Sequence, residues 1–135
     1  MAGSLTGLTV GLTSVAQAAP TAAHKLKVVK IVTRKPIGKM LATLKGKGAS
    51  LYYMPKGKCG PSCLSFWPPL LMPKGSKATP TGVACLGTAK FGKRLQVTYR
   101  GKRLYTFVSD TGASVTGNGV AGFVAAKVKT GKCPK

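Results

Sequence analysis

Hydrophobic and polar residues alternate along short stretches of this chain. The clearest stretch is 94–100, where Leu95, Val97 and Tyr99 fall on one face and polar or basic residues fall on the other. A period of two residues is typical of a strand with one buried face. A Gly-Lys turn follows and leads into a second β-prone stretch at 103–109. We therefore predict a hairpin whose basic face points to solvent.

Other stretches of this kind are separated by turn residues. The β-branched, lysine-bearing stretch 25–33 predicts a strand at a sheet edge. The stretches 39–44 and 50–54 flank a Lys-Gly-Lys-Gly turn and predict another hairpin, and a last strand is expected at 123–129. The proline-rich segment 55–80 predicts irregular structure. Helical periodicity is weak throughout, so we expect an all-β fold.

The two hairpin patterns repeat at a spacing of about 53 residues. The stretches 38–41 and 51–54 recur as 92–95 and 104–107, and in each copy the second strand opens with Leu-Tyr. An aromatic residue ends the loop after each copy: Trp67 and Phe123. One hairpin is marginal in water, whereas two can bury their apolar faces together. We predict a small β-sandwich or barrel-like domain made of two pseudo-repeated hairpin units.

The charge balance points to a partner. The chain has 135 residues, which suits one domain, and it carries 22 Lys and Arg against a single acid, Asp110, for a formal net charge of +21. Internal ion pairs cannot neutralise these cations, so they are solvated or meet an anionic partner. The charge either keeps the protein soluble or binds polyanions, and we favour binding.

The expected partner is an anionic cell-wall polymer, an anionic lipid surface or non-specifically bound nucleic acid. A secreted nucleic-acid-binding or cationic antimicrobial protein is the alternative function. The basic residues of the predicted strands and turns would form the contact: Lys39, Lys93, Arg94, Arg100, Lys102 and Arg103.

The first residues resemble an export signal. An apolar stretch at 5–15 precedes Ala16-Gln17-Ala18, an A-x-A cleavage site that places the mature start near Ala19. The usual positive n-region is missing, because no Lys or Arg precedes Lys25, and the natural start could lie further upstream. The stretch is too short to span a membrane. We expect a secreted or envelope-associated protein with three parts: a signal peptide at 1–18, a basic segment and edge strand at 19–36, and a disulfide-bearing β domain at 37–135.

Four cysteines follow the predicted signal: Cys59, Cys63, Cys85 and Cys133. An even number in a small exported domain predicts disulfides, and three pairings are possible. The Gly-Pro turn favours a local Cys59–Cys63 bridge, which leaves Cys85–Cys133. A zinc site with His24 as an extra ligand is the alternative, but the cysteine spacing departs from C-x₂-C.

Two sequence motifs contain the aromatic residues Trp67, Tyr105 and Phe107 and the acidic residue Asp110. Residues 105–110 have the form Y-x-[FWY]-x-x-D, and Cys59 to Cys63 followed by Trp67-Pro68-Pro69-Leu70 has the form C-x₃-C…W-P-P-L. In these features, and in Asn118-Gly119 before Phe123, the chain resembles the bacterial secreted-repeat family of predicted lipoproteins. The resemblance implies a small exported envelope domain and carries no established activity.

The resemblance covers roughly residues 37–129 and weakens in the first half. Residues 52–57 lack the third-position aromatic and the aspartate of the motif, and no lipid-anchor cysteine follows the cleavage site. The lysine richness is a further departure.

Asp110 is the only carboxylate side chain, which excludes hydrolysis by a carboxylate pair and a metal site built from several acids. We expect its side chain to cap a turn through backbone N–H groups. His24 and Ser109 could complete a nominal triad with it, but His24 has no orienting context. We therefore expect a non-enzymatic protein without a cofactor. The aromatic residues are expected to fill the core.

Overall fold

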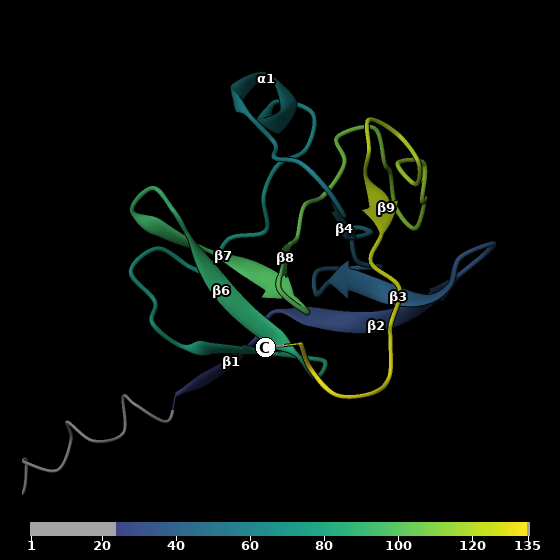
Figure 1. Cartoon of the computed structure of the whole chain (residues 1–135). Coiled ribbons are helices and arrows are strands. Elements are labelled where there is room, and N and C mark those ends of the chain that lie inside the picture. Colours follow the sequence, from purple (N-terminus) through teal and green to yellow (C-terminus); the bar gives the residue numbers. More distant parts are fainter. Residues whose placement is uncertain (1–23, 135) are drawn as a thin grey trace, which may run out of the picture.

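A computed structural model describes residues 24–134 of the chain (Figure 1). The expected signal peptide and the mature start near Ala19 lie outside these residues. The elements in chain order are β1 (Lys25–Lys27), β2 (Val29–Arg34), β3 (Gly38–Thr43), β4 (Tyr52–Tyr53), α1 (Pro61–Leu64), β5 (Thr79–Thr81), β6 (Leu86–Phe91), β7 (Arg94–Tyr99), β8 (Lys102–Arg103) and β9 (Val124–Ala125). The fold is nearly all-β, as predicted. No helix in this part of the chain is long and apolar enough to cross a membrane.

Two antiparallel hairpins form the framework of the domain. β2 pairs along its whole length with β3, and β6 pairs along its whole length with β7, which also carries the short β8. The small sheet β4–β9 and the parallel pair β1–β5 join these hairpins. Within residues 24–134 the sheets do not close into a barrel.

The hairpin partners differ from those expected. The main partner of β3 is β2, and the expected partner at 50–54 meets β3 only through a bridge between Ala42 and Ser50. β6 has no counterpart in the sequence prediction. The expected strand at 103–109 ends at Arg103: the Leu104 N–H still donates to Val97 of β7, and Tyr105 then pairs with Tyr52 instead.

The two halves of the domain meet at a reciprocal pair of hydrogen bonds. The Tyr52 N–H donates to the Tyr105 carbonyl over 2.8 Å, and the Tyr105 N–H donates to the Tyr52 carbonyl over 2.9 Å. Further backbone bonds of the first half recur at equivalent positions of the second. The bond from Ala126 N–H to Leu51 O corresponds to the bond from Leu70 N–H to Leu104 O. Likewise, Leu41 N–H to Ala126 O corresponds to Val97 N–H to Leu70 O. The third pair is Val128 N–H to Lys39 O and Met72 N–H to Leu95 O. A pseudo-two-fold axis therefore passes between the two tyrosines.

This axis also corrects the alignment of the repeat. Tyr52 and Tyr105 correspond, as the Leu-Tyr pattern predicts, but Leu41 corresponds to Val97 and not to Leu95. The reason is that the connection after β3 is three residues longer than the connection after β7.

The core consists of two clusters of buried side chains. The aliphatic cluster contains Val29, Leu41, Leu51, Met72, Ala78, Val97, Tyr99, Leu104 and Ala126. The aromatic cluster contains Met40, Tyr52, Trp67, Tyr105, Phe123 and Ala125. Because Val29 belongs to the first cluster, the segment expected as a basic edge strand contributes to the same core as the rest of the domain.

Both faces of β7 are covered. Gln96 is fully buried and Thr98 is 8% exposed, although both lie on the face that was expected to point to solvent. The segment at 70–72 runs beside this strand through an antiparallel bridge between Leu71 and Gln96, with hydrogen bonds from Met72 N–H to the Leu95 carbonyl and from Val97 N–H to the Leu70 carbonyl. The alternation of β7 therefore does not separate a buried face from an exposed one.

Candidate functional site

A stack of three rings forms the centre of the aromatic cluster. Trp67 lies between Phe107 and Phe123, with ring centroids 4.2 Å and 3.7 Å away and nearly parallel planes. Tyr52 meets the Trp67 ring edge-on, and Tyr105 meets Phe123 in the same way. The expected core role of these five aromatic residues is thus confirmed. It is wrong for Phe66, which was also expected in the core and is largely exposed.

Asp110 fixes the loop that follows it. Its Oδ1 accepts hydrogen bonds from the Thr116 N–H (2.8 Å), the Thr116 hydroxyl (2.7 Å) and the Ser114 hydroxyl (3.3 Å). Its Oδ2 accepts the hydroxyl of Tyr52 over 2.6 Å. Asp110 therefore caps the turn, as expected, and also joins the two halves through Tyr52.

The Tyr52 hydroxyl is enclosed on its other side by backbone. It accepts the Gly117 N–H over 3.1 Å, and a side chain at Gly117 would bring a Cβ within 2.7 Å of the Trp67 ring. Burial, followed by the hydrogen bond to Asp110, raises the pKa of Tyr52 well above its usual range. The hydroxyl is thus held in its neutral, donating form.

The hydroxyl of Tyr105 has a different environment. The pseudo-two-fold axis pairs Tyr105 with Tyr52, so the residue that corresponds to Asp110 is Gly57, which has no carboxylate. Within residues 24–134 the Tyr105 hydroxyl makes no hydrogen bond. Tyr105 and Gly57 instead line the same cavity, which has a volume of about 580 Å³.

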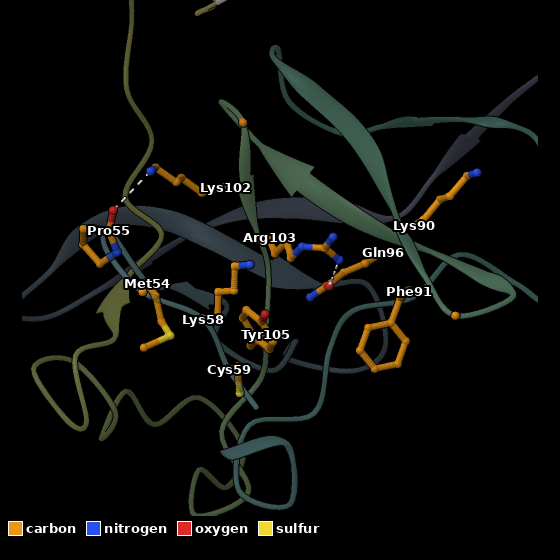
Figure 2. A pocket seen from close by; sticks show the side chains of 13 residues that line it. Met54, Pro55, Lys58, Cys59, Lys90, Phe91, Gln96, Lys102, Arg103 and Tyr105 are labelled. Atoms are coloured by element: carbon orange, nitrogen blue, oxygen red, sulfur yellow. Dashed lines mark hydrogen bonds between the residues drawn. The ribbon is translucent and has the colours of Figure 1, made fainter. Parts of the chain in front are cut away.

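Four cationic residues contribute to the wall of this cavity. Its wall contains Met54, Pro55, Gly57, Lys58, Cys59, Lys90, Phe91, Gly92, Gln96, Gly101, Lys102, Arg103 and Tyr105. Figure 2 shows Lys58, Arg103 and Tyr105 in the middle of the view, while Lys90 extends away from them. Lys102 is turned toward the Pro55 carbonyl, to which it donates a hydrogen bond over 3.1 Å.

A buried amide positions Arg103. The Gln96 side chain donates to the Leu104 carbonyl over 2.9 Å and accepts from Arg103 Nη1 over 2.8 Å. Gln96 is fully buried, so its orientation is fixed, and Arg103 retains other N–H groups for a ligand.

The six residues expected to bind polyanions have different surroundings in the structure. Lys102 and Arg103 line the cavity, and Arg100 and Lys102 line a smaller one of about 150 Å³. Lys39 and Lys93 are exposed on different hairpins.

Two of the expected arginines are half-buried and bonded to the fold. Arg94 donates to the Met72 carbonyl, and Arg100 donates to the Lys132 carbonyl and the Cys85 sulfur. These hydrogen bonds hold both guanidinium groups against the fold.

Sequence reasoning missed Lys58 and Lys90 as cavity residues. Lys58 could have been found by aligning residues 52–57 with 105–110, since it follows the position that Asp110 occupies in the second half. Lys90 lies on β6, and no pattern in the sequence relates it to Lys58.

All four cysteines form disulfides, Cys59–Cys63 and Cys85–Cys133, which confirms the favoured pairing. No thiol is left for zinc. In residues 24–134 no group of histidine, cysteine and acidic side chains is arranged to hold a metal ion. Two disulfides in a small domain are compatible with an extracellular or periplasmic location.

The motif residues Trp67, Tyr105, Phe107 and Asp110 all support the core or the turn after it. Because these residues have structural roles, the cationic cavity beside Tyr105 remains as the candidate functional site. No family model, curated protein or solved structure matches the chain.

Proposed function

We propose that the protein is a non-enzymatic, exported domain of the cell envelope that binds anionic polymers by electrostatic contact. The observation that carries the proposal is the charge of +21 with a single side-chain carboxylate. That carboxylate accepts its hydrogen bonds from Tyr52, Ser114 and Thr116, which are neutral groups. The cations therefore lack an internal counterion, and an external polyanion supplies one.

The lysines are available for such contacts. Within residues 24–134 every lysine except Lys30 is exposed, whereas Arg34, Arg94 and Arg100 are buried or half-buried. Arg34, for example, donates hydrogen bonds to Ser50 and to backbone carbonyls of the turn after β3. We therefore assign polymer binding to the lysines rather than to most of the arginines.

The proposed partner is a wall-type anionic polymer, with anionic lipid and nucleic acid as competing partners to be tested. The main aromatic rings fill the core, so base stacking of the kind used by single-strand binders has little surface available here. Binding through charge alone would be broad in sequence. The resemblance to the secreted-repeat family supports an exported envelope role without naming a ligand.

The proposal is tested by measuring affinity for a cell-wall fraction, duplex DNA and anionic vesicles at several salt concentrations. For duplex DNA we expect log K to fall against log salt with a slope of roughly −4 to −5, at about −0.9 per phosphate neutralised. The wall fraction should bind more tightly than DNA and vesicles at the same salt. Salt-independent binding, or none at low salt, would leave solubility as the reason for the charge.

A variant set sharpens this test. Lys39, Lys93 and Lys127 are exposed and lie outside the cavity. Replacing all three with Gln should flatten the DNA slope by about 1 per lysine, while replacing them with Arg keeps the charge and serves as the matched control. Equal slopes in the two variants would contradict the assignment.

A further inference from the structure

The two tyrosines at the pseudo-two-fold axis have equivalent backbones and unequal surroundings. The Tyr52 hydroxyl donates to the carboxylate of Asp110 over 2.6 Å. The equivalent hydroxyl, that of Tyr105, faces a cavity next to Gly57, where no acid is present. One half of the fold thus holds an internal carboxylate in the place where the other half has open space.

The groups around that space suit an anion. Lys58, Lys90, Lys102 and Arg103 line the cavity, and its wall contains no acidic side chain. The guanidinium of Arg103 is held by Gln96, which leaves N–H donors in a fixed plane. A planar guanidinium recognises a carboxylate through paired, charge-assisted hydrogen bonds.

The cavity has room for a ligand larger than a carboxylate group. About 580 Å³ lies within the range of small-molecule sites and leaves room for a unit of monosaccharide size. Phe91 and Met54 provide apolar surface on the wall, and Figure 2 shows the Phe91 ring apart from the cations. A sugar ring carries both kinds of surface, CH groups and polar groups.

We propose that the cavity beside Tyr105 binds the carboxylate of an acidic sugar unit, in the position that Asp110 occupies beside Tyr52. The Tyr105 hydroxyl, Arg103 and Lys58 bind the carboxylate, and Phe91 contacts the ring. This inference deepens the proposed function and rests on it, since it names the anionic group that the polymer presents to one defined site.

The test uses glucuronate as the probe and glucose as its neutral counterpart, in calorimetric titrations of the full chain. Glucuronate should bind at one site per chain, and glucose should not bind at the same concentrations. Tyr105→Phe removes the hydroxyl and keeps the ring, and should weaken glucuronate about tenfold. The matched control is Tyr52→Phe, which removes the equivalent hydroxyl from the internal site and should leave the affinity unchanged.

Two variants of Lys58 separate loss of charge from filling of the site. Lys58→Gln should weaken glucuronate several-fold. Lys58→Glu places a carboxylate at the cavity and should abolish binding. The thermal midpoint of each variant shows whether the domain is still folded. If both variants fold and bind glucuronate as tightly as the unmodified chain, the assignment is overturned.

Further probes identify the source of the anion. An oligomer of glucuronate that binds more tightly than the monomer places the carboxylate on a polymer, whereas equal affinity per unit assigns the site to the free acid sugar. Inorganic phosphate binding as tightly as glucuronate, or equal binding of glucose, overturns the carboxylate assignment. Failure here differs from failure of the proposed function, which is measured on the Lys39, Lys93 and Lys127 variants outside the cavity.

Discussion

The two halves of this domain share a backbone pattern and differ in what their tyrosines meet. Tyr52 is fully buried and its hydroxyl is enclosed by Asp110 and Gly117. Tyr105 has the same backbone bonds, but its hydroxyl borders a cavity with four cations in the wall. In one half a carboxylate of the chain binds the tyrosine hydroxyl and fills the space beside it. In the other half no carboxylate is present at the equivalent place, and the space is open.

The difference depends on one position and its neighbour. In the second half Asp110 carries the acid, and in the first half Gly57 and Lys58 occupy the equivalent place. Loss of an acid and gain of cations reverse the electrostatic character of the site without changing the strands around it. One half thus supplies its own anion beside the tyrosine, and the other half has only cations there.

The largest expected effect comes from Trp67, whose ring stacks between those of Phe107 and Phe123. Trp67→Ala removes a side chain that is 2% exposed and should lower the free energy of unfolding by about 3–5 kcal/mol in urea denaturation. Phe66→Ala is the control, because that ring is 59% exposed, and its effect should stay within about 0.5 kcal/mol. Equal losses at the two positions would contradict the stacked core.

The two disulfides should differ in the stability that they confer. Cys85–Cys133 closes a long loop in the second half and Cys59–Cys63 a very short one in the first. The chain-entropy model gives about 4 kcal/mol for the long loop and about 2 kcal/mol for the short one. Paired Cys→Ala variants, compared by thermal unfolding, measure this difference. A larger loss from the short loop would show that native contacts of residues 59–63 matter more than loop closure.

The comparison of the tyrosines is tested most directly by removing their hydroxyls. Tyr52→Phe removes the hydrogen-bond partner of Asp110 Oδ2 and of the Gly117 N–H and should cost about 1–2 kcal/mol of stability. Asp110→Asn should cost a similar amount. Tyr105→Phe should be within about 0.5 kcal/mol of the unmodified chain, because its hydroxyl has no partner to lose in the described residues. Equal losses at the two tyrosines would show that the halves do not differ as described.

The smallest expected effect is a dependence on pH. The folded state raises the pKa of Tyr52, so its stabilising contribution is present below the pKa of the unfolded chain, about 10, and is lost as the pH rises above it. At pH 10 the loss should be about 0.4 kcal/mol. Denaturation curves of the chain and of Tyr52→Phe, recorded between pH 8 and 11, isolate this contribution. Parallel curves would show that Tyr52 ionises equally in both states.

Much of the fold could be predicted from local patterns. The Leu-Tyr repeat, the aromatic core and the turn capped by Asp110 depend on residues close in sequence or on side-chain type. The pairing of the cysteines followed from their spacing. β6 escaped prediction because its small residues, such as Gly87 and Ala89, give no clear hydrophobic alternation.

The candidate site could not be predicted in the same way. Arg94 and Arg100 were expected in solvent, but both donate hydrogen bonds to backbone carbonyls of distant segments, which the alternation of one strand does not reveal. The cavity combines Lys58, Lys90 and Arg103 from separate parts of the chain. Their role becomes visible only when the surroundings of Tyr105 are compared with those of Tyr52 across the pseudo-two-fold axis.

The interleaving of the halves has a consequence for the time at which the domain can fold. β4 pairs with β9, so the sheet that contains Tyr52 can form only after Ala125 has been synthesised. At a synthesis rate of about 5–20 residues per second, this delay is about 4–15 s. During that interval the aromatic cluster lacks Phe123 and the chain cannot close its core. The nascent chain therefore stays open for seconds, long enough for another protein to bind it before it folds.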